Sequence, residues 1–305
     1  MVPNKVLIIG LGQLGLPAAK YVKEGGFDTY GYDINPSAME TAHTVAGIKQ
    51  VTDFASDDFD AYLICVSTHK PDDMFSPQID GLLSIAGKIS REAKKDGALV
   101  SIESTIPKGT SKKIFEILNH RLHVVHAPHR WYALQEKDHG VNQLRVIGGV
   151  YDCCLRAGMQ FYNGTNSILG EERERHPGTI HSSGRSLGIP VHSVSNIEIA
   201  ETTKVVENSH RYLQIAFAEE LYLYCQADGI NFAELRDALN SKWNVQILEP
   251  REGIGGHCLP KDTRMFLQSS KSIKSKILAA AMEVDEEYKR YRAKLYSQSE
   301  NKIAA

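Results

Sequence analysis

The run Lys5-Val-Leu-Ile-Ile-Gly-Leu-Gly-Gln-Leu-Gly15 decides the fold. Its first residues form a mainly apolar stretch of strand length, and the glycines after them lead into a helix-forming segment from Ala18. The first glycine permits a tight turn, the second lets a pyrophosphate approach the backbone, and the third lets helix and strand pack closely. The free N–H groups at the start of the helix then face the phosphates. The run therefore predicts a dinucleotide site, formed by Gly10, Gly12, Gln13, Leu14 and Gly15.

A carboxylate follows these glycines at a suitable spacing. The segment Thr29-Tyr-Gly-Tyr-Asp33 is expected to be a second strand, and Asp33 can accept both hydroxyls of an adenosine ribose. A 2'-phosphate would meet like charge there, and no arginine directly follows Asp33 to receive it. The sequence therefore favours NAD over NADP. The alternative is that Asp33 only starts the turn before Pro36.

Strands and helices continue to alternate after this point. Further strands are expected at 61–66, 98–102 and 122–126, with helices at about 79–95 and 108–119 between them. The alternation predicts an α/β fold with a doubly wound, Rossmann-like parallel sheet. Ligands of such sheets bind at the carboxyl ends of the strands, where Ser67, Thr68 and Thr105 fall. We expect these hydroxyls to contact the cofactor, although hydroxyls in such positions also cap helices and turns.

Length and composition limit the remaining function classes. The 305 residues suffice for two domains, which we place at 1–195, the NAD-binding domain, and at 196–305, a smaller helical domain for dimerisation and catalysis. A formal net charge of -2 gives no general attraction to nucleic acid or to an anionic membrane. The apolar run near the start is too short for a signal peptide or a membrane span, so we expect a cytoplasmic protein. Five cysteines without paired metal-ligand spacing predict free thiols and no metal site.

The second domain is expected to be built on one long helix. Residues 199–227 contain neither proline nor glycine and are apolar on most sides. Such a helix needs a packing partner on each side, so we expect it to form the centre of the domain and the interface of a homodimer. It places Lys204 and Asn208 on one face. Residues 275–297 predict an amphipathic helix, and the polar segment 163–185 is interpreted as a surface excursion without a function.

A cysteine in a glycine-rich setting predicts covalent chemistry. The segment Gly253-Ile-Gly-Gly-His-Cys-Leu-Pro-Lys-Asp262 sets this thiol between glycines that admit a substrate and residues that hold water and charge. Taken alone, it is equally a turn followed by a structural thiol. Attack on a carbonyl requires a thiolate, a cation and an amide for the oxyanion, and a carboxylate that orders water. Cys258, Lys204, Asn208 and Asp262 are these residue types, so we predict that they are catalytic.

Several motifs, in one order along the chain, resemble those of the nucleotide-sugar 6-dehydrogenases, which are the UDP-glucose, UDP-N-acetylmannosamine and GDP-mannose dehydrogenases. The resemblance covers roughly residues 3–268, and the His257-Cys258 pair is most similar to the branch that acts on N-acetylated sugars. The motifs are Gly10-x-Gly-x-x-Gly15, Asp33, Ser67-Thr68, Glu103-Ser-Thr-Ile-Pro-Lys-Gly-Thr110, Ala200-Glu-x-x-Lys-x-x-Glu-Asn208 and Gly255-Gly-His-Cys-Leu-Pro-Lys-Asp262.

The resemblance implies a four-electron oxidation of the C6 hydroxyl of a nucleotide sugar by two NAD in turn. It implies that Cys258 holds the aldehyde as a thiohemiacetal and then a thioester, while Asp262 and Thr105 order the water. Lys204 and Asn208 would hold the oxyanion and, with Gly255, the substrate. The resemblance also implies that Lys261 contacts the cofactor.

The chain departs from the family in two places. His129 stands after Pro128 where the family has a glutamate that assists thioester hydrolysis; a neutral imidazole can serve as the base, or the histidine only caps a loop. The family also continues into a third, nucleotide-binding domain, which this chain is expected to lack. We therefore expect a partner subunit or a separate nucleotide-binding polypeptide to complete the site, or a smaller substrate. The alternatives are a catalytically impaired NAD-binding scaffold and a two-electron dehydrogenase of the hydroxy-acid type.

Overall fold

The computed structural model describes residues 5–70, 72–131, 140–164, 185–269 and 275–303. The chain folds into two compact units. The first comprises residues 1–68 and 78–204, and the second comprises 69–77 and 205–305. The division falls inside a long helix a few residues after the boundary expected at 195, and a short excursion from the first half of the sequence joins the second unit.

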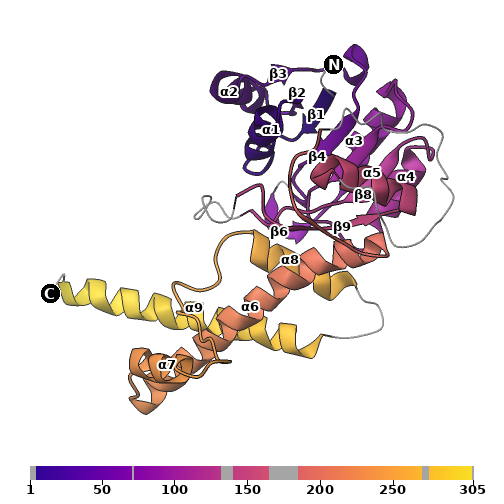
Figure 1. Ribbon diagram of the computed structural model, residues 1–305. Helices are drawn as coiled ribbons and strands as arrows, with labels where there is room; N and C mark the ends of the chain where they lie inside the picture. The colour runs from indigo at the N-terminus through magenta and orange to yellow at the C-terminus, as the bar shows by residue number, and fades with distance from the viewer. Residues whose placement is uncertain (1–4, 71, 132–139, 165–184, 270–274, 304–305) are drawn as a thin grey trace. The chain divides into compact units, whose positions relative to one another are not determined.

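An eight-stranded sheet forms the centre of the first unit (Figure 1). Its strand order is β10-β9-β8-β7-β4-β1-β2-β3, and β1, β4, β7 and β8 are buried almost throughout, as strands in a sheet covered on both faces should be. The strands are β1 (Lys5–Ile9), β2 (Asp28–Tyr32), β3 (Lys49–Gln50), β4 (Ala61–Ile64), β7 (Leu99–Ile102), β8 (His123–His126), β9 (Arg145–Gly149) and β10 (Val191–Ser193).

The sheet is parallel from β3 through β8, which confirms the predicted doubly wound α/β class. Beyond β8 the direction changes: β9 pairs antiparallel with β8, and β10 then pairs parallel with β9. The described residues between β8 and β9 contain no crossover helix, so the chain turns back beside β8.

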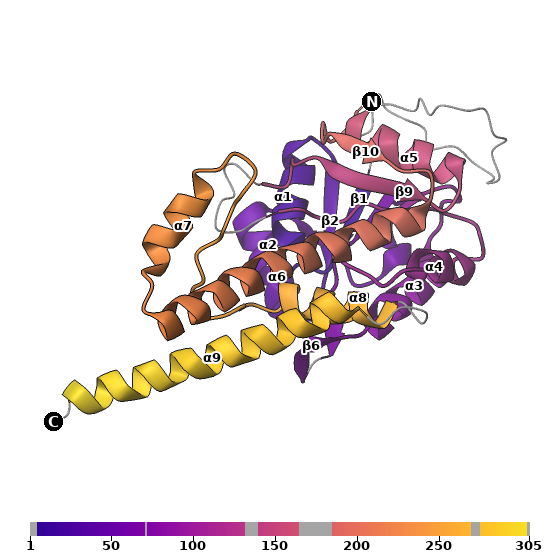
Figure 2. The same ribbon diagram turned by 90° about the horizontal axis from the view of Figure 1, so that it is seen from below.

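The helices that connect the strands along the chain pack against the sheet. Figures 1 and 2 show α1 and α2 beside the first strands and α4 and α5 beside β8 and β9. Helix α2 shows why the sequence folds this way locally: the Asn35 side chain accepts the N–H of Ser37, Pro36 takes the first helical position, and Gly47 ends the helix at a φ of 59°. The helices are α1 (Gly15–Glu24), α2 (Pro36–Ala46), the 3-10 turn η1 (Phe54–Ser56), α3 (Asp80–Glu92), α4 (Thr110–Ile117) and α5 (Asp152–Asn163).

The second unit is helical, as predicted, and includes one short hairpin. Its apolar centre joins Tyr212 and Ala216 of α6, Ile254 of the loop after α7, and Ala281 of α9. The expected polar excursion at 163–185 lies almost wholly outside the described residues. The elements are β5 (His69–Lys70), β6 (Asp73–Pro77), α6 (Ile197–Asp228), α7 (Phe232–Asn240), α8 (Cys258–Ser269) and α9 (Lys276–Ile303).

Helix α6 is less enclosed within one chain than the sequence predicts. Val206, Phe217 and Tyr224 are 38%, 56% and 53% exposed. Their spacings of eleven and seven residues bring them onto one stripe of the helix. Among the described residues, we find no helix with the length and apolar character that a membrane span requires.

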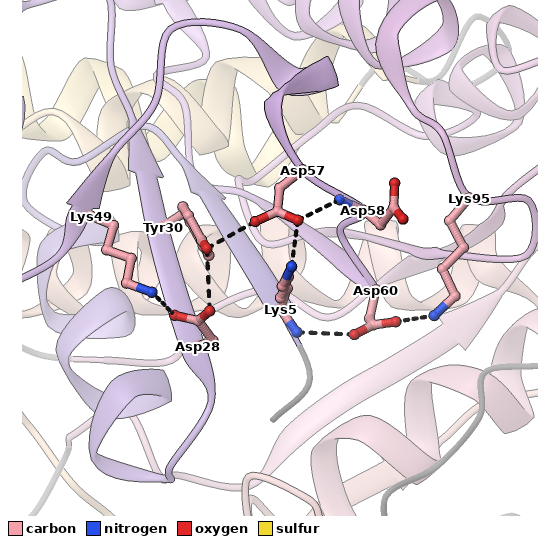
Figure 3. Close-up of polar contacts among 8 residues, drawn as sticks. All are labelled: Lys5, Asp28, Tyr30, Lys49, Asp57, Asp58, Asp60 and Lys95. Atoms are coloured by element: carbon pink, nitrogen blue, oxygen red, sulfur yellow. Dashed lines mark hydrogen bonds and ion pairs between the residues drawn. The ribbon is translucent and has the colours of Figure 1, made fainter. Parts of the chain in front are cut away.

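Lysines and aspartates bind together the strand ends opposite the glycine turn (Figure 3). Lys5 contacts Asp57 through its ammonium group and donates its backbone N–H to Asp60 at 2.9 Å. Tyr30 lies between Asp57 and Asp28, at 2.9 and 3.2 Å. The pKa of the Asp57 carboxyl falls from 3.8 to about 2, because the Lys5 ammonium favours its ionised form. The network therefore ties β1, β2 and the start of β4 together.

Replacing Asp57 by asparagine is expected to lower the free energy of unfolding by about 1 kcal/mol at neutral pH, since the pair is partly exposed. The folded pKa of Asp57 lies below its ordinary value. Its contribution is therefore present above pH 3.8 and is lost as the pH falls toward about 2. Urea unfolding at neutral and acidic pH checks this. The exposed neighbour Asp58→Asn is the control, and an equal effect of both substitutions at neutral pH would contradict the prediction.

Candidate active site

The glycine turn between β1 and α1 has the geometry that a phosphate group needs. Gly10 has a φ of +91°, and a Cβ there would lie 2.7 Å from the carbonyl oxygen of Cys65. A Cβ on Gly15 would lie 1.7 Å from the carbonyl oxygen of Gly10, whereas one on Gly12 would meet nothing within 4 Å. No side chain caps α1 at Leu14. The turn therefore leaves open space and backbone N–H groups that can receive an anion.

Asp33 lies beside this turn, directly after β2. One carboxylate oxygen accepts the N–H of Leu11 at 2.7 Å, and the other accepts the N–H of Asn35 at 2.8 Å. These two bonds fix the carboxylate at the tip of the strand, and each oxygen retains a second lone pair. The arrangement suits a ribose whose two hydroxyls donate to one carboxylate.

The predicted hydroxyl residues follow two neighbouring strands of the same sheet edge. Ser67 and Thr68 come after β4, and Thr105 comes after β7, which pairs directly with β4. The Ser104 hydroxyl ties the two strand ends together by donating to the carbonyl of Val66 at 2.6 Å. Thr68 is 4% exposed, whereas Ser67 is exposed and Thr105 is half-buried. Ser67 and Thr105 are therefore the more accessible of the three.

A buried charged cluster lies behind Thr105, and we call it the Glu103 cluster. Glu103 contacts the Nε2 of His129, accepts a hydrogen bond from the hydroxyl of Tyr162, and lies 2.9 Å from the guanidinium of Arg145. The Tyr162 hydroxyl also lies 2.7 Å from the hydroxyl of Ser101. The side chain of Glu103 is fully enclosed. A buried carboxylate is stable only when a counter-charge and hydrogen-bond donors compensate for its lost hydration.

The charges of the cluster follow from their surroundings. Burial alone would raise the pKa of Glu103, but Arg145 and then His129 bring it well below its usual range, so the carboxylate is ionised. Burial, and then the charge of Arg145, lower the pKa of His129, so its ring is neutral at neutral pH. The His129 Nδ1 lies 3.2 Å from an Arg145 nitrogen, which can only donate. The ring proton therefore sits on Nε2, toward Glu103.

This placement bears on the predicted role of His129 as a base. Both ring nitrogens face charged partners, and the residue is 4% exposed. A base must present a lone pair to the proton that it removes. His129 could do so only after its ring leaves Arg145. Its part in hydrolysis stays a prediction.

Two residues outside the sequence motifs, and one that a motif contains without a predicted role, also shape this unit. Arg145 and Tyr162 complete the Glu103 cluster. They lie 42 and 59 residues after Glu103 in the sequence, and no local sequence pattern predicts contacts over such separations. Glu201 is fully buried and accepts the N–H groups of Gly109 at 2.6 Å and Ser111 at 2.7 Å, at the start of α4. It thereby caps α4 from α6 and fixes the first turns of α6, from which Lys204 extends.

Cys258 is the first residue of α8 in the second unit, and it is exposed. Its sulfur lies 3.6 Å from the Nε2 of His257, whose ring packs against that of His69 at 5.5 Å. A Cβ on Gly255 would meet nothing within 4 Å. The thiol therefore has open space beside it, at a helix end that favours negative charge.

A buried acid lies one turn further along α8. Asp262 accepts a hydrogen bond from the side-chain amide of Asn208 on α6 and pairs with the Lys261 ammonium at 2.7 Å. The side chains of Lys261 and Asp262 are 6% and 2% exposed. One amide hydrogen of Asn208 is used in this contact, and the second remains for another acceptor. The second unit therefore brings Asn208 and Lys261 together around Asp262.

Among the described residues, two groups of side chains in the first unit have the atom types that bind metal ions. The ligand atoms of Cys65, Glu103 and His129 lie within 4.8 Å of one another, but Arg145 already supplies the positive charge there. The second group is His123, Cys153 and Cys154, all buried.

Comparison with known proteins identifies the family. Residues 39–166 match the NAD binding domain of the UDP-glucose/GDP-mannose dehydrogenase family, and residues 198–287 match its central domain. The two matches together take in well over half of the chain. The chain belongs to the UDP-glucose/GDP-mannose dehydrogenase family.

Named relatives agree with this assignment. A UDP-N-acetyl-D-mannosamine dehydrogenase of Methanococcus maripaludis is 26% identical over 98% of this chain and 69% of its own length. One of Pyrococcus horikoshii is 30% identical over 88% of this chain and 65% of its own length. A solved structure of a UDP-D-ManNAc dehydrogenase from Pyrococcus horikoshii has 25% identity and a TM-score of 0.78, and the match covers 98% of this chain and 72% of that one. The chain thus spans about two thirds of the length of these relatives.

NAD is the cofactor of this family domain, and the residues present fit it. The uncapped start of α1 and the open side of Gly12 suit the pyrophosphate, and the carboxylate of Asp33 suits an unphosphorylated ribose. The predicted site residues divide between the units. The first unit holds Gly10, Gly12, Gln13, Leu14, Gly15, Asp33, Ser67, Thr68, Thr105, His129 and Lys204, and the second holds Asn208, Gly255, Cys258, Lys261 and Asp262.

Proposed function

We propose that this chain oxidises the C6 hydroxyl of a nucleotide sugar to a carboxylate, with covalent catalysis by Cys258. The observation that carries the proposal is the exposed thiol at the start of α8, in the same unit as the half-buried Asn208 and the buried Asp262 and Lys261. The relatives named above are UDP-N-acetylmannosamine dehydrogenases, so a UDP-N-acetylhexosamine is the substrate class to test first.

NAD, when bound, accepts a hydride in each of two oxidations, from alcohol to aldehyde and from thiohemiacetal to thioester. In the first, a water ordered by Asp262 and Thr105 takes the hydroxyl proton, and the charge of Lys204 favours its loss. The carboxyl group of Asp262 is already held by Asn208 and Lys261, so it can orient this water without large movement.

Cys258 acts between the two oxidations. Its sulfur attacks the aldehyde carbon, the carbonyl π bond breaks, and the oxygen takes the electron pair. We propose that Lys204 and the second amide hydrogen of Asn208 stabilise this oxyanion. After the second oxidation, water adds to the thioester, the carbon–sulfur bond breaks, and the sulfur leaves as thiolate with the acid as product. Hydrolysis thus returns Cys258 to its starting state, with His129 as the predicted base.

A panel of nucleotide sugars, assayed by NADH absorbance with the purified chain, tests the proposal. NADH formation is expected with at least one UDP-N-acetylhexosamine. NAD binding without NADH from any sugar would reject the stand-alone enzyme and favour the scaffold alternative. Rescue by an added polypeptide would instead support the predicted separate nucleotide-binding subunit.

We also propose that the exposed stripe of α6 forms the interface of a homodimer. Val206, Phe217 and Tyr224 present apolar surface on one side of the helix, and association would remove it from water. Replacing Phe217 by glutamate is expected to convert a dimer into a monomer, because two carboxylates would be buried across a symmetric contact. Sedimentation velocity checks this against Glu220→Gln, an exposed change on the same helix. A Phe217→Glu protein that remains dimeric would contradict the proposal.

A further inference from the structure

One face of α9 holds the loop that precedes Cys258. Asp285 accepts the N–H of Ile254 at 2.8 Å, and Lys289 donates to the Ile254 carbonyl at 3.0 Å. Tyr288 donates to the carbonyl of Arg251 at 2.7 Å. Ile254 lies outside any helix or strand, yet both of its backbone groups are bonded to α9. The loop is therefore fixed by side chains rather than by secondary structure.

The contacts form one continuous arrangement, because residues spaced three and four apart share a helix face. Lys289 lies 2.8 Å from Asp285, and Tyr212 of α6 donates to the same carboxylate at 2.9 Å. Asp285 is 3% exposed and Tyr288 is fully buried. Ile254 itself is 2% exposed and packs in the apolar centre of the unit. Helix α9 thus holds the loop by hydrogen bonds, while α6 packs against Ile254 and donates to Asp285.

Gly253, next to Ile254, stands where a larger residue would clash with Lys289. Gly253 has a φ of +93°, and a Cβ there would lie 2.6 Å from the side chain of Lys289. The loop backbone therefore lies directly against the lysine stem. Four residues beyond Ile254, without an intervening element, the chain reaches the thiol at the start of α8.

We propose that Asp285, Lys289 and Tyr212 are positioning residues for Cys258: by fixing Ile254, they set where α8 begins and where its first residue presents the thiol. The inference rests on the proposed function only in naming Cys258 as the reactive group. The contacts themselves lie within one unit of the chain.

Glu219 gives this arrangement a pH dependence. It is fully buried on α6, seven residues after Tyr212, and neither carboxylate oxygen has a hydrogen-bond partner among the described residues. Burial, and then the nearby charge of Asp285, raise the pKa of Glu219 to about 8, while Lys289 opposes the shift. Tyr212 and Tyr288 are the other titratable groups that its charge affects.

Protonation of Glu219 makes the free energy of unfolding depend on pH. Because the folded pKa of Glu219 lies above its ordinary value of 4.5, the folded state binds the extra proton, and stability falls as the pH rises from 4.5 toward about 8. Ionised Glu219 would place a second negative charge near Asp285. The hold on Ile254 is therefore expected to weaken above about pH 8 in the native protein, and to stay constant in Glu219→Gln.

Hydrogen exchange and thiol alkylation on the full chain test the proposal. In Lys289→Met, which keeps the apolar stem, the protection factor of the Ile254 amide and the rate of Cys258 alkylation by iodoacetamide at neutral pH are each expected to fall about tenfold, as for the loss of one hydrogen bond to a charged group. Asp285→Asn should act in the same direction. Lys294→Met, an exposed lysine on the same helix, is the matched control and should match the native protein.

The outcomes separate this inference from the proposed function. If Lys289→Met and Asp285→Asn leave Ile254 protection and Cys258 alkylation equal to those of Lys294→Met, the positioning role is overturned, whether or not the chain makes NADH. If both readouts fall in the two variants while the native protein makes no NADH with any sugar, the positioning role stands and the proposed function fails. If Ile254 protection falls in both variants while Cys258 alkylation stays equal to that of Lys294→Met, the contacts are only structural and the positioning role is overturned.

Discussion

Replacing Cys258 by serine is expected to lower the rate of carboxylate formation by at least about 10³-fold, in keeping with the removal of a catalytic nucleophile. The hydroxyl of serine is a far weaker nucleophile than a thiolate at neutral pH, and the structure places Cys258 at a helix start that favours the charged form. The first oxidation does not need the thiol. We therefore expect the variant to form NADH for the first step only, measured together with the sugar product by mass spectrometry.

Cys225→Ala is the control for this prediction, because it also removes one thiol from the second unit but from a buried site on α6. It should retain the complete reaction. A Cys258→Ser protein that forms the carboxylate at the native rate would show that no covalent intermediate is needed.

Replacing Glu103 by glutamine is expected to lower the free energy of unfolding by about 3–5 kcal/mol, because it leaves the buried Arg145 without its counter-charge. Arg145 is 2% exposed and 2.9 Å from Glu103, so water cannot take over the role of the carboxylate. Urea unfolding of the first unit, followed by circular dichroism, measures this. The loss should be accompanied by weaker NAD binding, since Thr105 follows Glu103 by two residues.

A double-mutant cycle gives the control. Arg145→Met alone should also be strongly destabilising, whereas Glu103→Gln combined with Arg145→Met should cost less than the sum of the two. Additive effects would show that the two side chains do not depend on each other, contrary to the account of the Glu103 cluster.

The parts of the fold that sequence could predict are those specified by local pattern. Strands β1, β4, β7 and β8 each contain consecutive apolar residues, and the glycine turn and Asp33 follow a known spacing. Strand β9 could not be predicted in this way, because it begins with an arginine and ends in two glycines, a composition typical of loops. The hairpin β5–β6 is largely polar, and its place in the second unit depends on packing against α8, which no local pattern encodes.

The site divides in the same way. Cys258, Lys204, Asn208 and Asp262 are recognisable because the chemistry limits the residue types. Neither the ion pair of Asp262 with Lys261 nor the contacts of His129 could be predicted, because they depend on side-chain positions in the folded protein. Sequence presents His129 as an available base, whereas the fold turns it toward Glu103 and Arg145.

The stoichiometry of the reaction tests the central claim most directly. With UDP-N-acetylmannosamine, or whichever UDP-N-acetylhexosamine proves active, NADH and the acid product should be counted in the same sample. Covalent catalysis by Cys258 predicts two NADH for each carboxylate formed and no accumulation of free aldehyde. One NADH per molecule of sugar, with an aldehyde or ketone as the final product, would contradict it.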